Sequence, residues 1–329
     1  MGFLSPTGYL LQPSCTIRRA LTVRPLPKPV RNILDLVGNT PMVQLSGIHE
    51  NVFVKLEFFN PGGSVKDRIG IGMIAKAERD GLLKKGGTII EPTAGNTGIG
   101  LALAGTRMGY RVILCVPEHF SVEKREVMKA LGGEVVLTPK DDGIRGAIAK
   151  AEELARGMEN AYVPQQFKNA YNSETHYETT GPEIWEQMDG RVDGFVCGCG
   201  TGGTFTGVAR FLRAQNPNVY CAIVEPQGSA IGGGQPGPHE VEGIGSSFLP
   251  PVLDLTLADE IIMVADSPAF KMCARLAAEE GILGGSSSGA NVTGAVQVAE
   301  KLGAGKRVVT IIPDAAERYM SKGIFTKWR

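Results

Sequence analysis

Short β-branched runs alternate along this chain with longer stretches of helical periodicity. The helical stretches include SVEKREVMKALGG and SPAFKMCARLAAEEGIL, in which apolar residues recur at helical spacing. We predict strands in the runs NVFVKLEFF, GTIIEP, YRVILCVP, GEVVLTP, DGFVCGCG, VYCAIVEP, EIIMVAD and RVVTIIPD. Strands that alternate with helices of this length usually pair in parallel, so the pattern predicts an α/β fold with mostly parallel sheets.

The length of the chain, 329 residues, indicates two lobes, because a domain commonly holds about 100 to 200 residues. We predict one lobe over about residues 70–175, and a second that combines residues 31–69 with 176–329. Residues 230–251 are rich in glycine and proline and form the longest irregular stretch. Such a stretch is typical of a mobile flap.

The charged residues balance, with 34 basic and 34 acidic side chains. The chain has no extended basic stripe, which argues against a nucleic-acid partner. No apolar run approaches the roughly 18 to 20 residues that cross a membrane. Small molecules are therefore the expected partners.

The six cysteines, at positions 15, 115, 197, 199, 221 and 273, are scattered and mostly lie in apolar runs. This distribution is typical of reduced core residues in a cytoplasmic protein. Cys197 and Cys199 would face the same side of a strand, where two thiols can bind a metal. No second Cys or His pair with ligand spacing accompanies them, so buried packing is favoured over a metal site.

Residues 1–30 differ in composition from the rest of the chain. They are basic, rich in proline, serine and threonine, and no acid occurs before Asp35. One interpretation is a transit peptide, which would place the mature protein in an organelle. The other is an N-terminal arm that lies on the body or across a dimer interface.

Three loops share one arrangement, in which glycine and small polar residues precede a helix. They are NPGGSVK, which ends at Lys66, TAGNT at residues 93–97, and GTGGT at residues 200–204. Helix N-termini present free backbone N–H groups and the positive end of the helix dipole, so each loop can bind an anion. Ligands of open α/β sheets gather at the carboxyl ends of strands.

A lysine at a helix start has a physical reason to be reactive. The helix dipole opposes the charge of Lys66, lowers the pKa of its amine and frees it for carbonyl chemistry, although most such lysines are simply solvated. The third loop has a rival interpretation, because Gly198, Gly200 and Gly203 fit the dinucleotide fingerprint and Glu225 follows near the spacing for a ribose contact. Glycines in such loops also often serve turn geometry alone.

Five motifs in order decide between these interpretations. NPGGSVKDR, EPTAGNTGIGLAL, GTGGTFTG, GSSSGA and PDAAERYMSKG together resemble the cysteine synthase and cystathionine β-synthase family of pyridoxal-phosphate enzymes, which have the tryptophan-synthase-β fold type. The resemblance runs from Asn32 to the C-terminus. It implies pyridoxal 5'-phosphate as cofactor, bound in the cleft between a smaller lobe (about 70–175) and a larger one.

The resemblance also implies roles at the matching positions. The catalytic residue is Lys66, which forms a Schiff base with the cofactor and moves the substrate's Cα proton. The cofactor-binding residues are Lys66, Asn96 at the ring hydroxyl, Gly200, Thr201, Gly202, Gly203 and Thr204 at the phosphate, and Ser287 at the pyridine nitrogen. The substrate-binding residues are Thr93, Ala94, Gly95, Asn96, Thr97, Gln166 and, in the flap, Gly243.

The implied reaction is β-replacement on an O-activated L-serine, with O-acetylserine favoured, through an α-aminoacrylate. A serine hydroxyl such as Ser287 cannot keep the pyridine nitrogen protonated, and the weaker electron sink favours loss of a β-leaving group over transamination. A sulfur nucleophile then adds at Cβ, giving cysteine from sulfide or cystathionine from homocysteine. Ala94 departs from the serine usual in cysteine synthases, and the pattern is most similar to bacterial cystathionine β-synthases that use O-acetylserine.

Several alternatives remain open from the sequence. O-phosphoserine, serine, thiosulfate or an amine can replace the favoured substrates. A distant alternative is an NAD-binding oxidoreductase, and a third is a non-catalytic module that regulates a serine acetyltransferase, against which the intact Lys66, Asn96 and Ser287 argue. The family is usually dimeric, so a homodimer is expected, with a serine acetyltransferase as a further partner.

Overall fold

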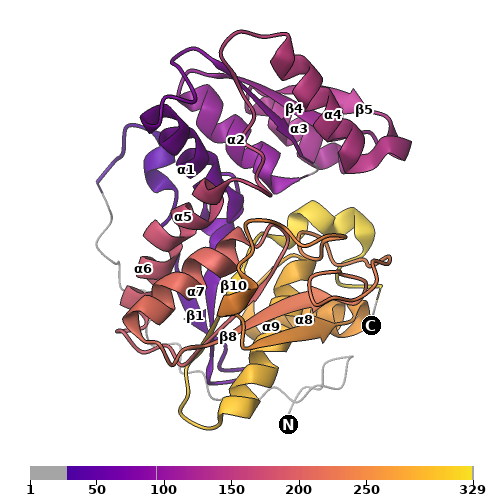
Figure 1. Ribbon diagram of the computed structural model, residues 1–329. Coiled ribbons are helices and arrows are strands. Elements are labelled where there is room, and N and C mark those ends of the chain that lie inside the picture. The colour runs from indigo at the N-terminus through magenta and orange to yellow at the C-terminus, as the bar shows by residue number, and fades with distance from the viewer. Residues whose placement is uncertain (1–27, 94, 328–329) are drawn as a thin grey trace. The chain divides into compact units, whose positions relative to one another are not determined.

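A computed structural model describes residues 28–93 and 95–327 (Figure 1). The chain divides into a unit of residues 1–31 and a compact unit of residues 32–329, called the body below. The arm and transit-peptide hypotheses for residues 1–30 therefore fall almost wholly outside the described residues. All elements given below belong to the body.

The larger sheet has six strands in the order β1-β2-β10-β7-β8-β9. Neighbouring strands pair in parallel, except that β1 and β2 are antiparallel. The strands are β1 (Met42–Gln44), β2 (Val52–Leu56), β10 (Val308–Ile312), β7 (Gly194–Gly198), β8 (Tyr220–Pro226) and β9 (Glu260–Val264).

The smaller sheet has four strands in the order β5-β4-β3-β6, all parallel. They are β5 (Glu134–Thr138), β4 (Arg111–Pro117), β3 (Thr88–Pro92) and β6 (Ala161–Tyr162). The predicted α/β fold with mostly parallel sheets is confirmed, and every predicted run contains a strand. The sequence does not predict β1 and β6, because strands of three and two residues are too short to show a period.

Helices cover both faces of each sheet, so most strands contribute alternate residues to two cores. In β7, Val196 packs into one cluster while Phe195 and Cys197 pack into another. In β4, Val112 and Ile113 likewise belong to different clusters. The helices are α1 (Lys66–Arg79), α2 (Asn96–Arg107), α3 (Val122–Ala130), α4 (Gly143–Arg156), α5 (Ala170–Glu178), α6 (Thr180–Gln187), α7 (Gly203–Gln215), α8 (Asp266–Glu280) and α9 (Ser286–Leu302).

The proposed lobe boundaries near residues 70 and 175 stay a prediction. Residues 227–254, between β8 and a short 3₁₀ helix (Leu255–Leu257), contain no helix or strand. This segment includes the predicted flap, whose mobility likewise stays a prediction.

Helices α1 and α2 cross at glycines, which lets their backbones touch. A Cβ atom on Gly70 would lie 2.4 Å from the carbonyl oxygen of Gly100, and one on Gly100 would lie 2.5 Å from the carbonyl oxygen of Lys66. No side chain fits at either position. The crossing therefore fixes the first turn of α1, where Lys66 lies, against α2.

A buried charge network around Arg68 also holds the first turn of α1 in place. Arg68 Nε donates to Glu57 at 2.7 Å, and its Nη1 donates to Glu183 at 2.7 Å. The fully buried Lys55 reaches the other oxygen of Glu183, also at 2.7 Å. Arg68 is thus a buried arginine paired with two carboxylates.

The network predicts a stability that depends on pH. Burial raises the pKa of Glu183, but Arg68 and Lys55 outweigh burial and bring it to about 2, below the usual 4.5. The ion pairs therefore stabilise the fold fully above pH 4.5 and lose that contribution as the pH falls toward 2. We expect Glu183→Gln to lower the free energy of unfolding at pH 7 by about 3 kcal/mol, as for other buried ion pairs that lose one partner.

Urea unfolding of both proteins between pH 3 and pH 7 measures this difference. The difference in free energy of unfolding between the two proteins should narrow as the pH falls below 4.5. An exposed pair gives the matched control, since Glu134→Gln breaks the contact of Glu134 with Arg111, both about half exposed, and should cost about 1 kcal/mol or less. A gap for Glu183→Gln that stays constant over the whole range would contradict the assignment.

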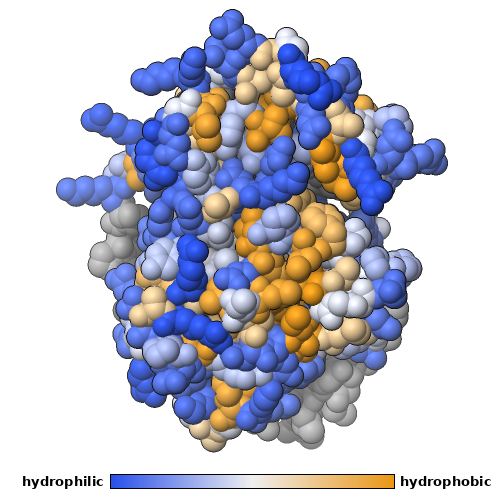
Figure 2. Space-filling view, in the orientation of Figure 1, coloured by the Kyte–Doolittle hydropathy of each residue, from blue (hydrophilic) through white to orange (hydrophobic). Residues whose placement is uncertain are grey.

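Exposed apolar side chains also mark the body. Figure 2 shows apolar residues gathered near the middle of the viewed face, with hydrophilic residues around them. The exposed apolar side chains of the described residues include Phe248 and Leu249 in the flap segment, at 45% and 51% exposure.

Among the described residues no helix is both long and apolar enough to cross a bilayer.

Candidate active site

A pocket lies where β7 and β10 end and where α1, α2 and α9 begin. Its walls include seven predicted cofactor residues and the flap's Gly243. The lining residues are Val65, Lys66, Asn96, Cys197, Gly198, Gly200, Thr201, Gly202, Thr204, Phe205, Gly243, Ile244, Ser287, Ile311, Pro313 and Asp314. Segments far apart in the sequence thus meet at the carboxyl edge of the larger sheet, as expected for an α/β ligand site.

Other predicted residues lie beside this lining rather than in it. Gly203 follows Gly202 as the first residue of α7. Thr93 and Gly95 precede α2, Thr97 is its second residue, and Gln166 lies between β6 and α5. None of these four residues lines the pocket. Ala94 lies outside the described residues.

Lys66 is the first residue of α1 and is held at the pocket by the segment that follows β10. The backbone N–H of Val65 donates to the carbonyl of Pro313 at 2.8 Å, and the N–H of Lys66 donates to Ser64 Oγ at 3.2 Å. Burial lowers the pKa of the Lys66 amine below its usual 10.5, against the opposing effects of nearby groups that include Asp314. The pKa is lowered as predicted, and burial of the amine contributes to that lowering.

The loop at residues 200–204 is an open cradle of backbone groups. Gly202 has φ +83°, and a Cβ on it would lie 2.5 Å from the Cβ of Leu253. A Cβ on Gly200 would lie 2.5 Å from the carbonyl oxygen of Gly243 in the flap. Only glycine fits at these positions, and the loop offers N–H groups and two threonine hydroxyls with no acidic side chain. Such a donor set suits an anion at the start of α7.

The second predicted loop is built around a pair of polar side chains. Thr97 Oγ1 donates to Gln166 Oε1 at 2.6 Å, and both side chains are buried. The buried carboxylate of Glu91, at the end of β3, accepts from the backbone N–H groups of Gln165 at 2.8 Å and Gln166 at 3.2 Å. Burial raises the pKa of Glu91 to about 7. Sequence reasoning missed Glu91, although it stands at a strand end next to the TAGNT motif.

The side chain of Asn96 is oriented by groups from the C-terminal segment. Its Nδ2 donates to Asp314 Oδ2 at 2.6 Å, and its Oδ1 accepts from Arg318. Tyr319 also donates to Asp314, a carboxyl whose pKa is raised by burial. Because Nδ2 carries two hydrogens, one N–H remains for a ligand. These three C-terminal residues were not predicted, and PDAAERY at the end of a strand is the signal that points to them.

Ser287 lies in the first turn of α9, in contact range of the flap. Its side chain is buried, and a Cβ on Gly243 would lie 3.9 Å from its hydroxyl oxygen. The neighbouring Ser286 hydroxyl accepts from the backbone N–H of Glu242 at 2.9 Å. The flap segment is thereby joined to the start of α9 at the pocket wall.

Comparison with known proteins decides the family. The model of the family described as "Pyridoxal-phosphate dependent enzyme" matches residues 33–314. The chain belongs to this family. Its cofactor is pyridoxal phosphate, and the resemblance seen in the sequence motifs is confirmed.

Curated relatives and solved structures agree with this assignment. The chain is 49% identical over 300 residues to the O-acetylserine dependent cystathionine beta-synthase of Bacillus subtilis, covering 90% of this chain and 98% of that protein. It is 48% identical over 306 residues to a cysteine synthase of Staphylococcus aureus, covering 91% and 98%. The O-acetylserine dependent cystathionine beta-synthase of Helicobacter pylori has a similar structure, with a TM-score of 0.85 at 44% identity over 90% of this chain and 99% of that one.

The pocket fits the pyridoxal-phosphate cofactor of the family. The glycine cradle at residues 200–204 offers N–H and O–H donors of the kind a phosphate needs, and the Lys66 amine lies in the same pocket. Asn96 has an N–H to spare for a ring oxygen. The pocket therefore combines an amine, a loop suited to an anion and an available amide N–H.

The dinucleotide interpretation requires Glu225 to be free to bind a ribose hydroxyl. Glu225 is buried at the end of β8, and its Oε2 accepts from the backbone N–H of Gly232 at 3.1 Å. Gly198 donates its N–H to Asn291 Oδ1 at 2.8 Å. Together with the family match, these contacts assign the glycines of this fingerprint to the pyridoxal-phosphate fold.

A buried lysine near the pocket was also missed. Lys124, on α3, is 5% exposed, and its Nζ lies 3.3 Å from Glu242 Oε2 in the flap and 4.6 Å from the centre of the Tyr319 ring. No motif marked it, because a lysine inside a helical stretch such as SVEKREVMK normally faces solvent.

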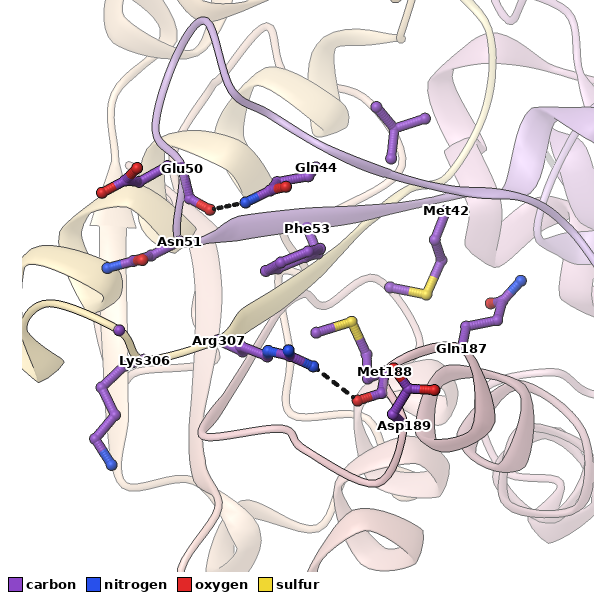
Figure 3. Close-up of a pocket in the computed structure, with 12 residues that line it drawn as sticks. Met42, Gln44, Glu50, Asn51, Phe53, Gln187, Met188, Asp189, Lys306 and Arg307 are labelled. Atoms are coloured by element: carbon purple, nitrogen blue, oxygen red, sulfur yellow. Dashed lines mark hydrogen bonds between the residues drawn. The ribbon is translucent and has the colours of Figure 1, made fainter. Parts of the chain in front are cut away.

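A second pocket of the body lies elsewhere and contains none of the predicted site residues. Figure 3 shows Met42 of β1 and Phe53 of β2 on one side of this pocket, with Met188 and Arg307 on the other. Arg307 Nη1 donates to the carbonyl of Met188 at 3.0 Å, and Gln44 Nε2 donates to that of Glu50 at 2.6 Å. It shares no residue with the pocket around Lys66.

Proposed function

We propose that this pyridoxal-phosphate enzyme catalyses β-replacement on an O-activated L-serine, most simply O-acetyl-L-serine, by a sulfur nucleophile. The products are L-cysteine from sulfide or L-cystathionine from homocysteine, with release of acetate. The observation that carries the proposal is the meeting of the buried Lys66 amine, the 200–204 loop and Ser287 in one pocket. The names of the Bacillus subtilis and Staphylococcus aureus relatives support both products.

The binding residues are assigned as the sequence motifs imply. The 200–204 loop holds the cofactor's phosphate, and Asn96 holds its ring oxygen. Residues 93–97 and Gln166 hold the substrate's α-carboxylate, for which the start of α2 offers backbone N–H groups. Gly243 brings the flap over the substrate.

Lys66 is the proton carrier of the reaction. The bound cofactor supplies an electron sink for negative charge at Cα. The Lys66 amine, with a pKa lowered by burial, takes the Cα proton and later returns it. A cationic lysine would have no lone pair for this step, so burial prepares the residue for its role.

Ser287 favours replacement over other reactions at the same carbon. Its hydroxyl would bond the ring nitrogen of the bound cofactor and would not hold a proton there as a carboxylate would. Negative charge at Cα is then relieved by loss of the β-substituent.

The identity of the activated serine and of the nucleophile is the finer part of the proposal. O-phosphoserine and amine nucleophiles are the alternatives, and Ala94, which lacks a serine hydroxyl, bears on that choice. We also propose a homodimer in the cytoplasm, with a serine acetyltransferase as a further partner. The free, buried cysteines at 115, 197, 199, 221 and 273 support a reducing compartment.

A nucleophile panel tests the proposal. Purified holoenzyme is incubated with O-acetyl-L-serine and, separately, sulfide, thiosulfate, homocysteine or an amine, and products are read by mass. We expect cysteine or cystathionine together with one acetate per product. The same panel with O-phospho-L-serine tests the alternative. Formation of pyruvate alone, or no turnover with any sulfur nucleophile, would contradict the proposal.

A further inference from the structure

Two side chains of α5 contact the two threonines of the 200–204 loop. Asn172 Nδ2 donates to Thr201 Oγ1 at 3.0 Å, and His176 Nε2 lies 3.1 Å from Thr204 Oγ1. Asn172 and His176 are both fully buried. Residues four apart lie on the same face of a helix, so one face of α5 meets both hydroxyls.

Glycines of α7 hold α5 close enough for these contacts. A Cβ on Gly203 would lie 2.0 Å from Asn172 Oδ1, and one on Gly207 would lie 2.2 Å from the carbonyl oxygen of Ser173 and 2.7 Å from the Cβ of His176. Larger residues at either position would push the helices apart. The distance between α5 and the loop is therefore set by backbone contact.

The hydrogens of the His176 ring can be assigned from its partners. Burial, with help from Lys66 and Arg68, holds the pKa of His176 well below 6.5, so the ring is neutral. Phosphate oxygens only accept, so a threonine hydroxyl that binds phosphate must give its one hydrogen to it. Thr204 Oγ1 must then accept from Nε2–H, and Nδ1, 2.8 Å from Thr180 Oγ1, accepts from the Thr180 hydroxyl.

The same logic applies to Thr201. Asn172 Nδ2 gives one hydrogen to Thr201 Oγ1 and the other to the carbonyl of Gln166 at 2.9 Å. Thr201 Oγ1 also accepts from the backbone N–H of Gly203 at 3.4 Å. Both lone pairs of this oxygen are then used, and its hydrogen is left for a ligand. Through Gln166, Asn172 also joins the phosphate loop to the loop assigned to the substrate carboxylate.

We propose that Asn172 and His176 are positioning residues that aim the Thr201 and Thr204 hydroxyls at the cofactor's phosphate. The inference rests on the assignment of the 200–204 loop to that phosphate under the proposed function. It adds a residue pair, a ring tautomer and a hydrogen-bond direction that the loop alone does not specify. A purely structural role of the two side chains would stabilise α5 against α7 without affecting phosphate recognition.

Cofactor affinity with and without the phosphate separates these roles. The apoenzyme is titrated with pyridoxal phosphate and with pyridoxal. The dissociation constant of pyridoxal divided by that of pyridoxal phosphate measures phosphate recognition. We expect His176→Phe to reduce this ratio about tenfold or more, since hydrogen bonds to charged groups are among the stronger ones. His176→Gln, whose amide can reach the place of Nε2, should restore part of the ratio. Asn172→Leu should act like His176→Phe.

A matched control lies on the same helix. The hydroxyl of Ser173, also buried, bonds to the carbonyl of Ala170 at 3.1 Å and makes no contact with the loop, so Ser173→Ala should leave the ratio unchanged. Nitrogen-15 NMR of the holoenzyme should find the His176 proton on Nε2, and the phosphorus-31 signal of the bound cofactor should move in His176→Phe. Unfolding of each apoenzyme measures any loss of fold.

The outcomes separate failure of the inference from failure of the proposed function. If Thr204→Val lowers the ratio while His176→Phe and Asn172→Leu leave it unchanged, the loop is correctly assigned and the positioning role is overturned. If Thr204→Val also leaves the ratio unchanged, the phosphate assignment itself fails. A proton on Nδ1 of His176 in the holoenzyme would overturn the assigned bond direction.

Discussion

Lys66→Ala is expected to abolish β-replacement, lowering kcat by at least about a thousandfold. The residue is both the attachment point of the cofactor and the proton carrier, and loss of a positioned acid or base alone typically costs about 10²- to 10⁴-fold. The buried amine that shares the pocket with Ser287 and the 200–204 loop has no second lysine in the lining to replace it. Steady-state kinetics with O-acetyl-L-serine and the best nucleophile of the panel measure the effect.

The control is an exposed lysine that does not line the pocket. Lys85 is exposed, between α1 and β3, so Lys85→Ala should retain the kcat of the unaltered protein. Far-ultraviolet circular dichroism should show that both variants are folded. Substantial turnover by a folded Lys66→Ala variant would remove Lys66 from the catalytic role.

Gly100→Ala is expected to lower the free energy of unfolding by about 3 kcal/mol, the upper end for overpacking a close contact. The added Cβ would lie 2.5 Å from the carbonyl oxygen of Lys66, a backbone atom of the neighbouring helix. Inside an exposed helix the same change would stabilise by about 1 kcal/mol, so the sign of the effect reports the crossing. Because the contact is with Lys66 itself, cofactor affinity should fall as well.

Gly157→Ala serves as the comparison. Gly157 follows α4 with φ −87°, and its added Cβ would have no neighbour closer than 3.6 Å. Urea unfolding should place this variant within about 0.5 kcal/mol of the original protein. A Gly100→Ala variant as stable as Gly157→Ala would show that α1 and α2 are not packed at Gly100.

Periodicity and motif order predicted most of the fold and most of the pocket residues. Runs such as YRVILCVP and RVVTIIPD read as strands because they are β-branched and bounded by turn residues, and parallel pairing brings their carboxyl ends to one edge. Lys66, Asn96, Thr201 and Ser287 were found through the motif resemblance, and the structure brings them into one pocket. The short strands β1 and β6 are defined by their pairing with neighbouring strands. A local sequence pattern does not show such pairing.

The supporting residues escaped prediction because their partners are distant in sequence. Asp314 contacts Asn96 across 218 positions, and Glu91 contacts the N–H of Gln166 across 75. His176 sits in the unremarkable helix AYNSETHYE, where a histidine shows no sign of its contact with Thr204. The burial that lowers the Lys66 pKa is likewise not visible in the sequence, whereas the helix start is.

The most direct test of the account is to find the lysine that carries the cofactor. The holoenzyme is reduced with borohydride, which makes the bond between cofactor and lysine permanent, and its peptides are mapped by mass. We predict one phosphopyridoxyl group per chain, on Lys66. A label on the nearby buried Lys124, or no label on a protein that binds the cofactor, would contradict the account.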